Sequence, residues 1–150
     1  MGAMNIRRAR RDDVPAIVAL YADDMLGAAR ETPHALDVYY AAFDALDGDR
    51  NHELVVGELD GRIVATLQLT FIQHLSHRGG KVAQVEAVRV AASLRGGGLG
   101  AALMRWAVER ARAAGCVRMQ LTSNKERTDA HRFYERLGFS RSHEGFKLYL

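Results

Sequence analysis

The chain has 150 residues, of which 48% are hydrophobic and 26% are charged, and its net charge is only +3. This length and composition predict a single folded domain over residues 1–150 and argue against a disordered chain. Apolar runs stay well short of the roughly 20 residues that span a bilayer, and the arginines do not form a stripe interleaved with aromatic residues. Neither a membrane nor a nucleic acid is therefore an expected partner.

The N-terminal residues and the cysteine content bear on the cellular compartment in which the protein is expected. Basic residues near the N-terminus are not followed by an apolar stretch, so no secretory signal is predicted. We interpret residues 1–3 as additions before Met4. Cys116 is the single cysteine, which fits a reducing compartment, and its place at the start of an apolar stretch predicts a core residue rather than a nucleophile. We expect a cytoplasmic protein.

Hydrophobic periodicity and turn residues predict alternating strands and helices. The pair Asp60-Gly61 lies between two β-rich runs and predicts a hairpin turn, while Gly115 and Gly138 stand where helices are expected to end. In chain order, the expected elements are a strand at Ile6, helices at about 14–25 and 33–46, strands at 53–59 and 62–72, a polar loop at 74–80, a strand at 82–90, a helix at 98–114, a strand at 117–122, a helix at 127–137 and one or two strands within 139–150.

This order of elements predicts a mixed α/β fold around one central sheet. The hairpin makes the early strands antiparallel, whereas a strand, helix and strand in succession form a parallel crossover later in the chain. The expected sheet has six or seven strands, flanked by four helices. No internal repeat or low-complexity segment is present.

The segment Arg95–Gly100 (RGGGLG) joins a strand to a helix. At such a junction several unpaired backbone N–H groups converge at the positive end of the helix dipole, which favours an anion. Glycines allow the ligand to approach the backbone closely. The loop therefore predicts a phosphate-binding site.

Two familiar phosphate-binding motifs fit this loop poorly. A P-loop needs Lys-Ser or Lys-Thr after the last glycine, but this sequence has Ala101-Ala102 there. A dinucleotide-binding fingerprint is nominally present from Gly96 to Ala101, yet a four-residue spacer separates it from the strand and no acidic residue follows about 20 positions later. The first motif is excluded and the second is only weakly supported.

A third interpretation is based on two motifs together. Arg95, Gly98 and Gly100 match the pattern Gln or Arg, two residues, Gly, one residue, Gly or Ala, and a second strand-to-helix segment contains Asn124 and the run AHRFYERLGF at 130–139. In these motifs, and in the order of elements over nearly the whole chain, the sequence resembles the GNAT superfamily of N-acetyltransferases. The resemblance implies the GNAT acyl-CoA N-acyltransferase fold, acetyl-CoA as co-substrate and transfer of an acetyl group to a primary amine by direct attack in a ternary complex.

The resemblance also implies roles for individual residues. Tyr134 matches the general acid that protonates the departing thiolate, and Glu86 matches the residue that removes the amine proton, often through water. From the residues alone, Tyr134 can equally belong to an apolar helix face and Glu86 can be a solvent-facing strand residue. Ala87 stands where many relatives carry Asp or Asn. The residues implied to bind acetyl-CoA are Val88, Arg89, Val90, Arg95, Gly96, Gly97, Gly98, Leu99, Gly100, Ala101, Asn124 and Arg127.

No metal site is expected. His74 and His77 share one loop, His131 lies elsewhere, and no carboxylate or cysteine at ligand spacing joins them.

Two features point to different acceptors. Residues 23–49 contain seven acidic residues against Arg30 alone, and an acidic wall would favour a cationic amine such as a polyamine, an aminoglycoside or a lysine-like group. The stretch 121–146, together with the histidines at 74 and 77, resembles the aminoalkylphosphonate acetyltransferase branch, which would place an anionic group beside His77 or Arg78. A protein N-acetyltransferase and a non-catalytic acetyl-CoA-binding module are further alternatives. The resemblance also implies a possible homodimer.

Overall fold

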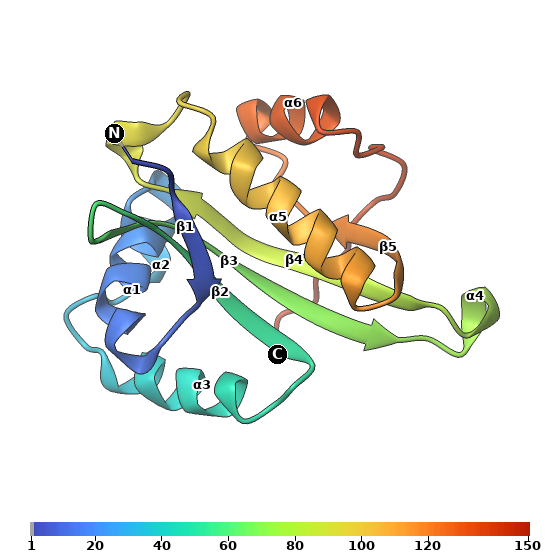
Figure 1. Cartoon of the computed structure of the whole chain (residues 1–150), viewed down its shortest axis with the longest axis horizontal. Helices are drawn as coiled ribbons and strands as arrows, with labels where there is room; N and C mark the ends of the chain where they lie inside the picture. Colours follow the sequence, from blue (N-terminus) through green and yellow to red (C-terminus); the bar gives the residue numbers. More distant parts are fainter. Residues whose placement is uncertain (1) are drawn as a thin grey trace.

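Five strands form one mixed sheet in the order β1-β2-β3-β4-β5 (Figure 1). The computed structural model describes residues 2–150, and Met1, one of the three residues interpreted as additions, lies outside this range. Neighbouring strands are antiparallel from β1 to β4, and β5 is parallel to β4. The predicted mixed α/β fold is confirmed, with five strands in place of six or seven. The strands are β1 (Asn5–Arg8), β2 (His52–Leu59), β3 (Arg62–Gln73), β4 (Lys81–Val90) and β5 (Cys116–Leu121).

Helices cover both faces of the sheet (Figure 1). Adjacent residues of β2 belong to two different cores, since Val55 packs with Leu103 of α5 and Val56 packs with Val18 of α1. Because successive strand residues point to opposite faces, α5 covers one face and α1 and α3 cover the other. No helix within residues 2–150 has the length and apolar composition needed to cross a membrane. The helices are α1 (Val14–Ala22), α2 (Met25–Arg30), α3 (Asp37–Asp47), α5 (Leu99–Ala113) and α6 (Thr128–Arg136).

Two hairpin connections use left-handed residue pairs. Asp60 and Gly61 have φ angles of 50° and 77°, which confirms the predicted tight turn between β2 and β3. Between β3 and β4, His77 and Arg78 have φ angles of 51° and 58°, so the four-residue segment α4 (Ser76–Gly79) is a left-handed turn. This turn precedes β4 and therefore lies at the opposite end of that strand from the glycine loop.

The first helical region is divided into α1 and α2, where the sequence predicts one continuous helix. Asp24 caps α2, because its Oδ1 accepts the N–H of Gly27 at 2.6 Å. A Cβ atom on Gly27 would lie 1.7 Å from the carbonyl oxygen of Tyr21, so only glycine permits α2 to fold back against α1. The break directs the Asp24 carboxylate toward the sheet.

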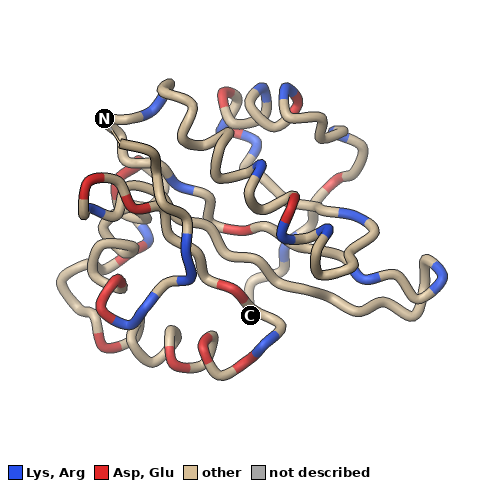
Figure 2. The backbone as a smooth tube through the Cα atoms, in the orientation of Figure 1, with Lys and Arg blue, Asp and Glu red and all other residues tan. Residues whose placement is uncertain are grey.

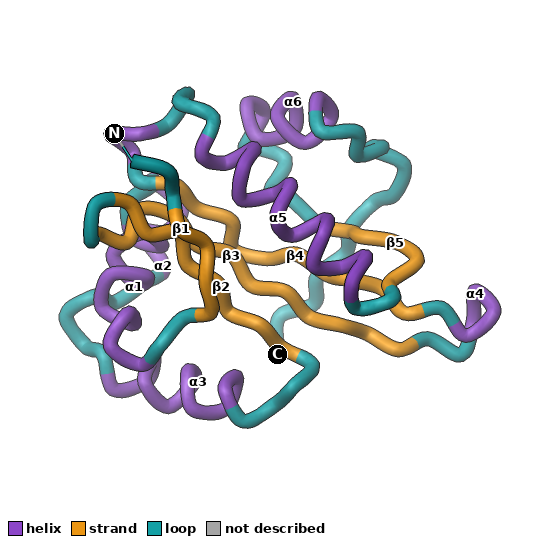
Figure 3. The backbone as a smooth tube through the Cα atoms, viewed as in Figure 1, coloured by secondary structure: helices purple, strands orange, loops and turns teal. Residues whose placement is uncertain are grey.

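The predicted strands within residues 139–150 are not formed in this chain. The described structure has neither helix nor strand there (Figure 3), and every residue from Ser140 onward is exposed. A strand needs a neighbour that pairs its backbone groups and a surface that buries one of its faces. This segment has neither within its own chain, so the prediction is wrong for the single chain.

Candidate active site

The sheet opens between β4 and β5. Backbone pairing between these strands ends at Val85 and Leu121, whereas β4 continues through Val90 paired with β3 alone. On the open side, the backbone groups of Glu86–Val90 have no partner strand. An extended ligand can add to such an edge through backbone hydrogen bonds. The three β4 residues implied to bind acetyl-CoA, Val88–Val90, all lie in this open stretch.

A bulge in β4 coincides with the opening. Arg89 pairs with Thr66 and Glu86 pairs with Gln68, so two β4 residues lie opposite one residue of β3. One of these two is Ala87, whose φ of 53° is in the left-handed region. A bulge bends its strand and increases the local twist. The bend accounts for the divergence of β4 from β5 beyond Val85.

We predict that Ala87→Asn stabilises the protein by about 0.5–1 kcal/mol, because Asn tolerates the left-handed conformation better than Ala. Urea unfolding measures the change. Ala113→Asn, on an exposed position of α5 with ordinary helical geometry, is the matched control and should lose about 0.5 kcal/mol through helix propensity. A less stable Ala87→Asn protein would show that residue 87 does not need this conformation.

The glycine loop leads into α5 through left-handed residues. Gly96 and Gly98 have φ angles of 82° and 86°, and Gly98 immediately precedes the 15-residue helix without a side-chain cap. The first N–H groups of α5, starting at Leu99, have no carbonyl partner within the helix. Both the free donors and the helix dipole favour an anion here. The geometry suits an anion at this loop, and the binding itself stays a prediction.

Neighbouring elements fix the position of this loop. The Nε of Arg95 donates to the carbonyl of Val90, and its Nη2 donates to the carbonyl of Asp23, both at 3.2 Å. A Cβ atom on Gly100 would lie 3.3 Å from the ring of Phe133, so glycine allows α6 to approach the start of α5. Arg95 thus joins the loop to the end of β4 and to the α1–α2 junction.

Tyr134 of α6 is half-buried beside two aromatic rings. Its ring meets those of Phe133 and Phe139 edge to face, at centroid distances of 5.1 and 5.9 Å. Burial raises the pKa of Tyr134 above its ordinary value, although the charges of Arg89 and Arg127 oppose this shift. The hydroxyl is therefore protonated at neutral pH, as a proton donor must be.

Asp24 holds two arginines beside the opening. Its Oδ2 accepts a hydrogen bond from Nη1 of Arg127 at 2.9 Å and lies 3.3 Å from Nε of Arg89. The Arg89 side chain is only 13% exposed. Its buried Nε forms no well-aligned hydrogen bond within residues 2–150. The charges of the same two arginines act on the pKa of Tyr134. One carboxylate, two guanidinium groups and a phenol thus come from three segments: the α1–α2 junction, β4 and the start and body of α6.

We predict that Asp24→Asn lowers the free energy of unfolding at pH 7 by about 1.5–3 kcal/mol, since hydrogen bonds to a charged group are lost. Burial raises the pKa of Asp24, but the hydrogen bonds from Arg127 and Gly27 and the charge of Arg89 outweigh it and lower the pKa. A lowered pKa stabilises the fold above the unfolded value of about 3.9, and this stabilisation is lost as the pH falls through the folded pKa.

Urea unfolding from pH 7 to pH 3 measures this effect. The difference between the wild-type and Asp24→Asn proteins should shrink below about pH 4, where the wild-type carboxyl also becomes neutral. Asp44→Asn is the control, because Asp44 forms an exposed pair with Arg11, worth only about 0–1 kcal/mol. A difference that does not vary with pH would contradict a role for the Asp24 charge.

Most of the other acidic residues of the segment 23–49 lie away from the opening, although Asp23 accepts the N–H of Ala92, just beyond β4, at 3.2 Å. Helix α3, which carries several of them (Figure 2), packs on β2 and α1 rather than on β4 or β5. Asp44 pairs with Arg11, and Glu31 pairs with Arg30. Within residues 2–150 the structure therefore gives no continuous acidic wall at the opening, and the cationic acceptor stays a prediction.

Glu86 and Asn124 lie at the border of the opening. Glu86 is exposed and stands one residue before the bulge. The Oδ1 of Asn124 accepts the N–H of Glu126, and its carbonyl accepts from Arg127 N at 3.0 Å and from His131 Nε2 at 2.9 Å. In this structure Asn124 shapes the loop that starts α6, and its contact with a ligand stays a prediction.

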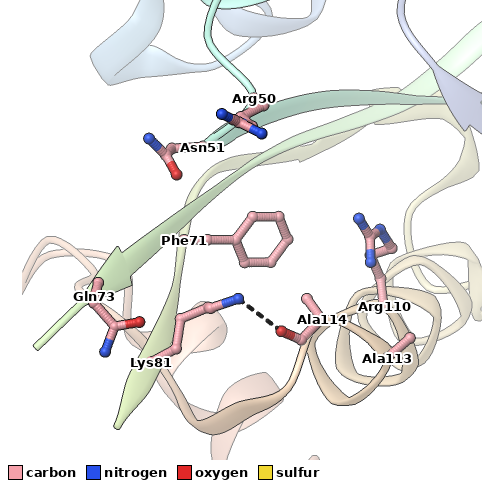
Figure 4. A pocket seen from close by; sticks show the side chains of 8 residues that line it. All are labelled: Arg50, Asn51, Phe71, Gln73, Lys81, Arg110, Ala113 and Ala114. Atoms are coloured by element: carbon pink, nitrogen blue, oxygen red, sulfur yellow. Dashed lines mark hydrogen bonds between the residues drawn. The ribbon is translucent and has the colours of Figure 1, made fainter. Parts of the chain in front are cut away.

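A cavity of about 450 Å³ lies away from this site, at the opposite end of β4 (Figure 4). Lys81 Nζ donates to the carbonyl of Ala114 at 2.9 Å, and Arg110 forms an ion pair with the buried Glu53. The Arg110 guanidinium also stacks on the ring of Phe71, 5.4 Å from its centroid. Both cations are thus engaged in holding the end of α5 on the sheet.

Metal-binding side chains do not gather in the described structure. His74 and His77 have ring centroids 5.9 Å apart, while His131 contacts Asn124. Within residues 2–150, no three His, Cys, Asp or Glu side chains are placed to share an ion.

The order of elements, the opening between β4 and β5 and the glycine loop define the acyl-CoA N-acyltransferase fold. The chain belongs to the acetyltransferase (GNAT) family, whose sequence profile matches residues 14–139. It is an N-acetyltransferase, as its relatives are.

Relatives of this chain share most of its length. The aminoalkylphosphonate N-acetyltransferase of Salmonella typhimurium is 30% identical over 146 residues, which cover 97% of this chain and 91% of the relative. Glucosamine 6-phosphate N-acetyltransferase 1 of Oryza sativa subsp. japonica is 32% identical over 120 residues, or 79% of this chain and 70% of the relative. A crystal structure described as a transcriptional regulator from Bacillus halodurans C-125 superposes with a TM-score of 0.95 at 43% identity, covering 99% of this chain and 100% of that one.

Proposed function

We propose that this enzyme transfers the acetyl group of acetyl-CoA to the primary amine of a small acceptor that also carries a phosphonate or phosphate group. The observation that carries the proposal is the cluster in which Asp24 joins Arg89 and Arg127 beside the open end of β4, with charges that act on the phenol of Tyr134. Tyr134 as proton donor and the two arginines as an anion-binding pair would then lie on either side of the acetyl group.

Acetyl-CoA supplies the activated thioester, and the residues present fit its phosphates and its pantetheine arm. The free N–H groups after Gly98 suit a pyrophosphate. On the side away from β3, Val88–Val90 have no partner strand, which suits a chain of amides that adds to a strand. Two side chains, Arg89 and Arg95, donate to the carbonyls of Val88 and Val90 in this structure. The residues of the loop from Gly96 to Ala101 would lie along the phosphates.

For each proton transfer and each developing charge in the reaction, we assign a residue that accepts, donates or stabilises it. Glu86, through water, accepts a proton from the amine. The amine nitrogen then forms the new bond to the acetyl carbon. A backbone N–H of Val88–Val90 stabilises the negative charge on the carbonyl oxygen. Tyr134 donates its proton to the sulfur as the carbon–sulfur bond breaks. The products are an amide and free CoA thiol.

An anionic acceptor agrees with the charges at the site better than a cationic one. Arg89 is largely buried with its Nε unsatisfied, Arg127 lies next to it, and one carboxylate, Asp24, faces both. The net charge of these three groups is positive. The two relatives compared above act, by their names, on amines that carry a phosphonate or a phosphate.

We predict that Arg127→Gln raises KM for an anionic acceptor by about 10–100-fold, which corresponds to losing a charged hydrogen bond of roughly 1.5–3 kcal/mol. The KM of an uncharged amine should change much less. Arg132→Gln is the matched control, since Arg132 is an exposed arginine on the same helix that pairs with the exposed Asp129. Equal KM changes for charged and uncharged amines would argue against contact between Arg127 and the anion.

Release of CoA thiol across a panel of amines tests the acceptor class. The panel contains aminoalkylphosphonates, glucosamine 6-phosphate, polyamines, aminoglycosides and lysine peptides. We expect the highest kcat/KM with an amine that bears a phosphonate or phosphate. Faster transfer to a polyamine or aminoglycoside would overturn the acceptor class, and faster transfer to a peptide would indicate a protein N-acetyltransferase. No turnover despite tight acetyl-CoA binding would indicate a non-catalytic module.

A further inference from the structure

The cavity at the far end of β4 from the glycine loop has the size of a small-molecule site (Figure 4). Its volume of about 450 Å³ falls within the range of about 300–1,000 Å³ that such sites occupy. Residues of the α3–β2 connection, the end of β3, the start of β4 and the end of α5 line it. Four parts of the chain thus meet around one space that the transfer reaction does not use.

The walls of this cavity carry an excess of positive charge. Arg50, Lys81 and Arg110 line it, and none of the described residues that line it is acidic. Glu53, with only 7% of its side chain exposed, pairs with Arg110. Asp49 precedes Arg50 in the chain, and its Oδ1 accepts the N–H of Asn51 at 2.9 Å. Even with both carboxylates counted, the three cations outnumber them, so the cavity attracts an anion.

Two of these cations are held in place and still have N–H groups to donate. Lys81 Nζ donates to the carbonyl of Ala114 at 2.9 Å, which uses one of the three N–H bonds of an ammonium. Arg110 donates to Glu53 through Nε and Nη2, while its Nη1 forms no hydrogen bond within residues 2–150. Cations that are fixed before binding lose little side-chain entropy when they bind. Phosphate and carboxylate oxygens are the acceptors that such donors hold most strongly.

The cavity also has an apolar wall. The half-buried ring of Phe71 lies between Arg50 and Lys81 in the view of Figure 4, and Ala113 and Ala114 add their methyl groups. Gln73 is fixed beside the ring, because its Nε2 donates to the carbonyl of Gly79 at 2.7 Å. An inorganic anion alone would leave this wall in contact with water. A ligand that carries a ring next to its anionic group would cover it, since aromatic rings pack favourably on one another.

We propose that this cavity binds a small metabolite in which a phosphate or carboxylate group is attached to an aromatic or heterocyclic ring. The anionic group lies among Arg50, Lys81 and Arg110, and the ring packs on Phe71. The site is separate from the glycine loop and from the acceptor site, which lie at the other ends of β4 and α5 (Figure 1). The proposal does not depend on the acceptor proposed above.

Calorimetric titration in the presence of saturating acetyl-CoA tests the site, because the glycine loop is then occupied. The probes are phenyl phosphate, benzoate and inorganic phosphate. We expect phenyl phosphate or benzoate to bind at least about 10-fold more tightly than inorganic phosphate, since only a ring buries the apolar wall. The tighter of the two identifies the anionic group. If neither ring-bearing probe bound, or if inorganic phosphate bound as tightly as both, the proposal would be wrong.

Two variants locate the bound probe. Arg50→Gln, at an exposed position of the cavity, should weaken binding of the better probe by about 5–10-fold. Ala113→Glu, at an exposed position of α5 that lines the cavity, should weaken it by more than about 10-fold, because its carboxylate repels the anion. Ala41→Glu is the matched control, since Ala41 is exposed on α3, which covers the other face of the sheet. It should bind the probe like the wild type.

Arg127→Gln distinguishes the cavity from the acceptor site. If this variant lost the probe while Ala113→Glu kept it, the probe would occupy the acceptor site and the cavity would not be the binding site. Wild-type affinity in both Arg50→Gln and Ala113→Glu would likewise overturn the proposal. Thermal unfolding of Ala113→Glu without any probe shows that the variant is folded, so a loss of binding is not a loss of structure.

Discussion

Tyr134→Phe is expected to lower kcat by about 10²–10³-fold, within the range that a positioned general acid contributes. The substitution removes the only proton that the side chain can donate, while the ring keeps its contacts with Phe133 and Phe139. The KM for acetyl-CoA and the unfolding midpoint should change little. Steady-state release of CoA thiol, combined with thermal unfolding, separates the loss of chemistry from a loss of structure.

Tyr40→Phe provides the control for Tyr134→Phe. Tyr40 lies on α3 beneath the guanidinium of Arg11, away from the opening in the sheet, and its variant should retain wild-type kcat. The pH profile adds a second readout. Because burial raises the pKa of Tyr134, its deprotonation should not reduce the rate below about pH 10, the ordinary value for tyrosine. Unchanged kcat in Tyr134→Phe would assign the proton donor to another group.

Gly98→Val is expected to raise the Kd of acetyl-CoA by about 30–100-fold. At φ of 86° a residue with a Cβ pays a conformational cost of about 1–2 kcal/mol, larger for a β-branched residue. The added side chain also stands beside the first free N–H groups of α5, where a phosphate would be bound. Equilibrium binding of acetyl-CoA to the variant measures the effect without any need for a known acceptor.

Gly61→Val separates backbone strain from loss of the anion cradle. Gly61 has a similar φ of 77° but lies in the β2–β3 hairpin, and a Cβ atom there would meet nothing within 4 Å. This variant should lose stability by about the same 1–2 kcal/mol and keep wild-type affinity for acetyl-CoA. If both variants bound acetyl-CoA equally well, the loop at Gly98 would not be the phosphate site.

Local patterns in the sequence predict most of the elements and the glycine loop. The hairpin at Asp60-Gly61 and the helix after Gly98 depend on residues that are close in sequence, and both are found where they are expected. The bulge at Ala87 is different, because alanine carries no preference for a left-handed φ. The pairing of β4 with β3 imposes the left-handed conformation on Ala87, so no local pattern in the sequence predicts the bulge.

The role of Asp24 shows a second limit of prediction from one sequence. Aspartate is a common helix cap, so the sequence alone is compatible with Asp24 as the cap of α2. Its partner Arg127, however, lies 103 residues away, so the cluster exists only after the sheet has formed. The composition of the acidic segment 23–49 predicts one continuous surface, whereas its residues contact different neighbours in the folded chain.

The terminal segment illustrates a third limit. The alternation in residues 146–150 is a valid strand signal, but a strand also needs a neighbour, and periodicity does not say which chain supplies it.

The linkage of Asp24 to Arg89 and Arg127 also bears on how the enzyme matures. Contacts between residues so distant in sequence form late, after the loops between them have closed. During synthesis the N-terminal helices and the first strands emerge before the segment that carries Arg127. Tyr134 and the cluster of Asp24, Arg89 and Arg127 therefore come together in one of the last steps of folding, and an incomplete chain cannot assemble this site.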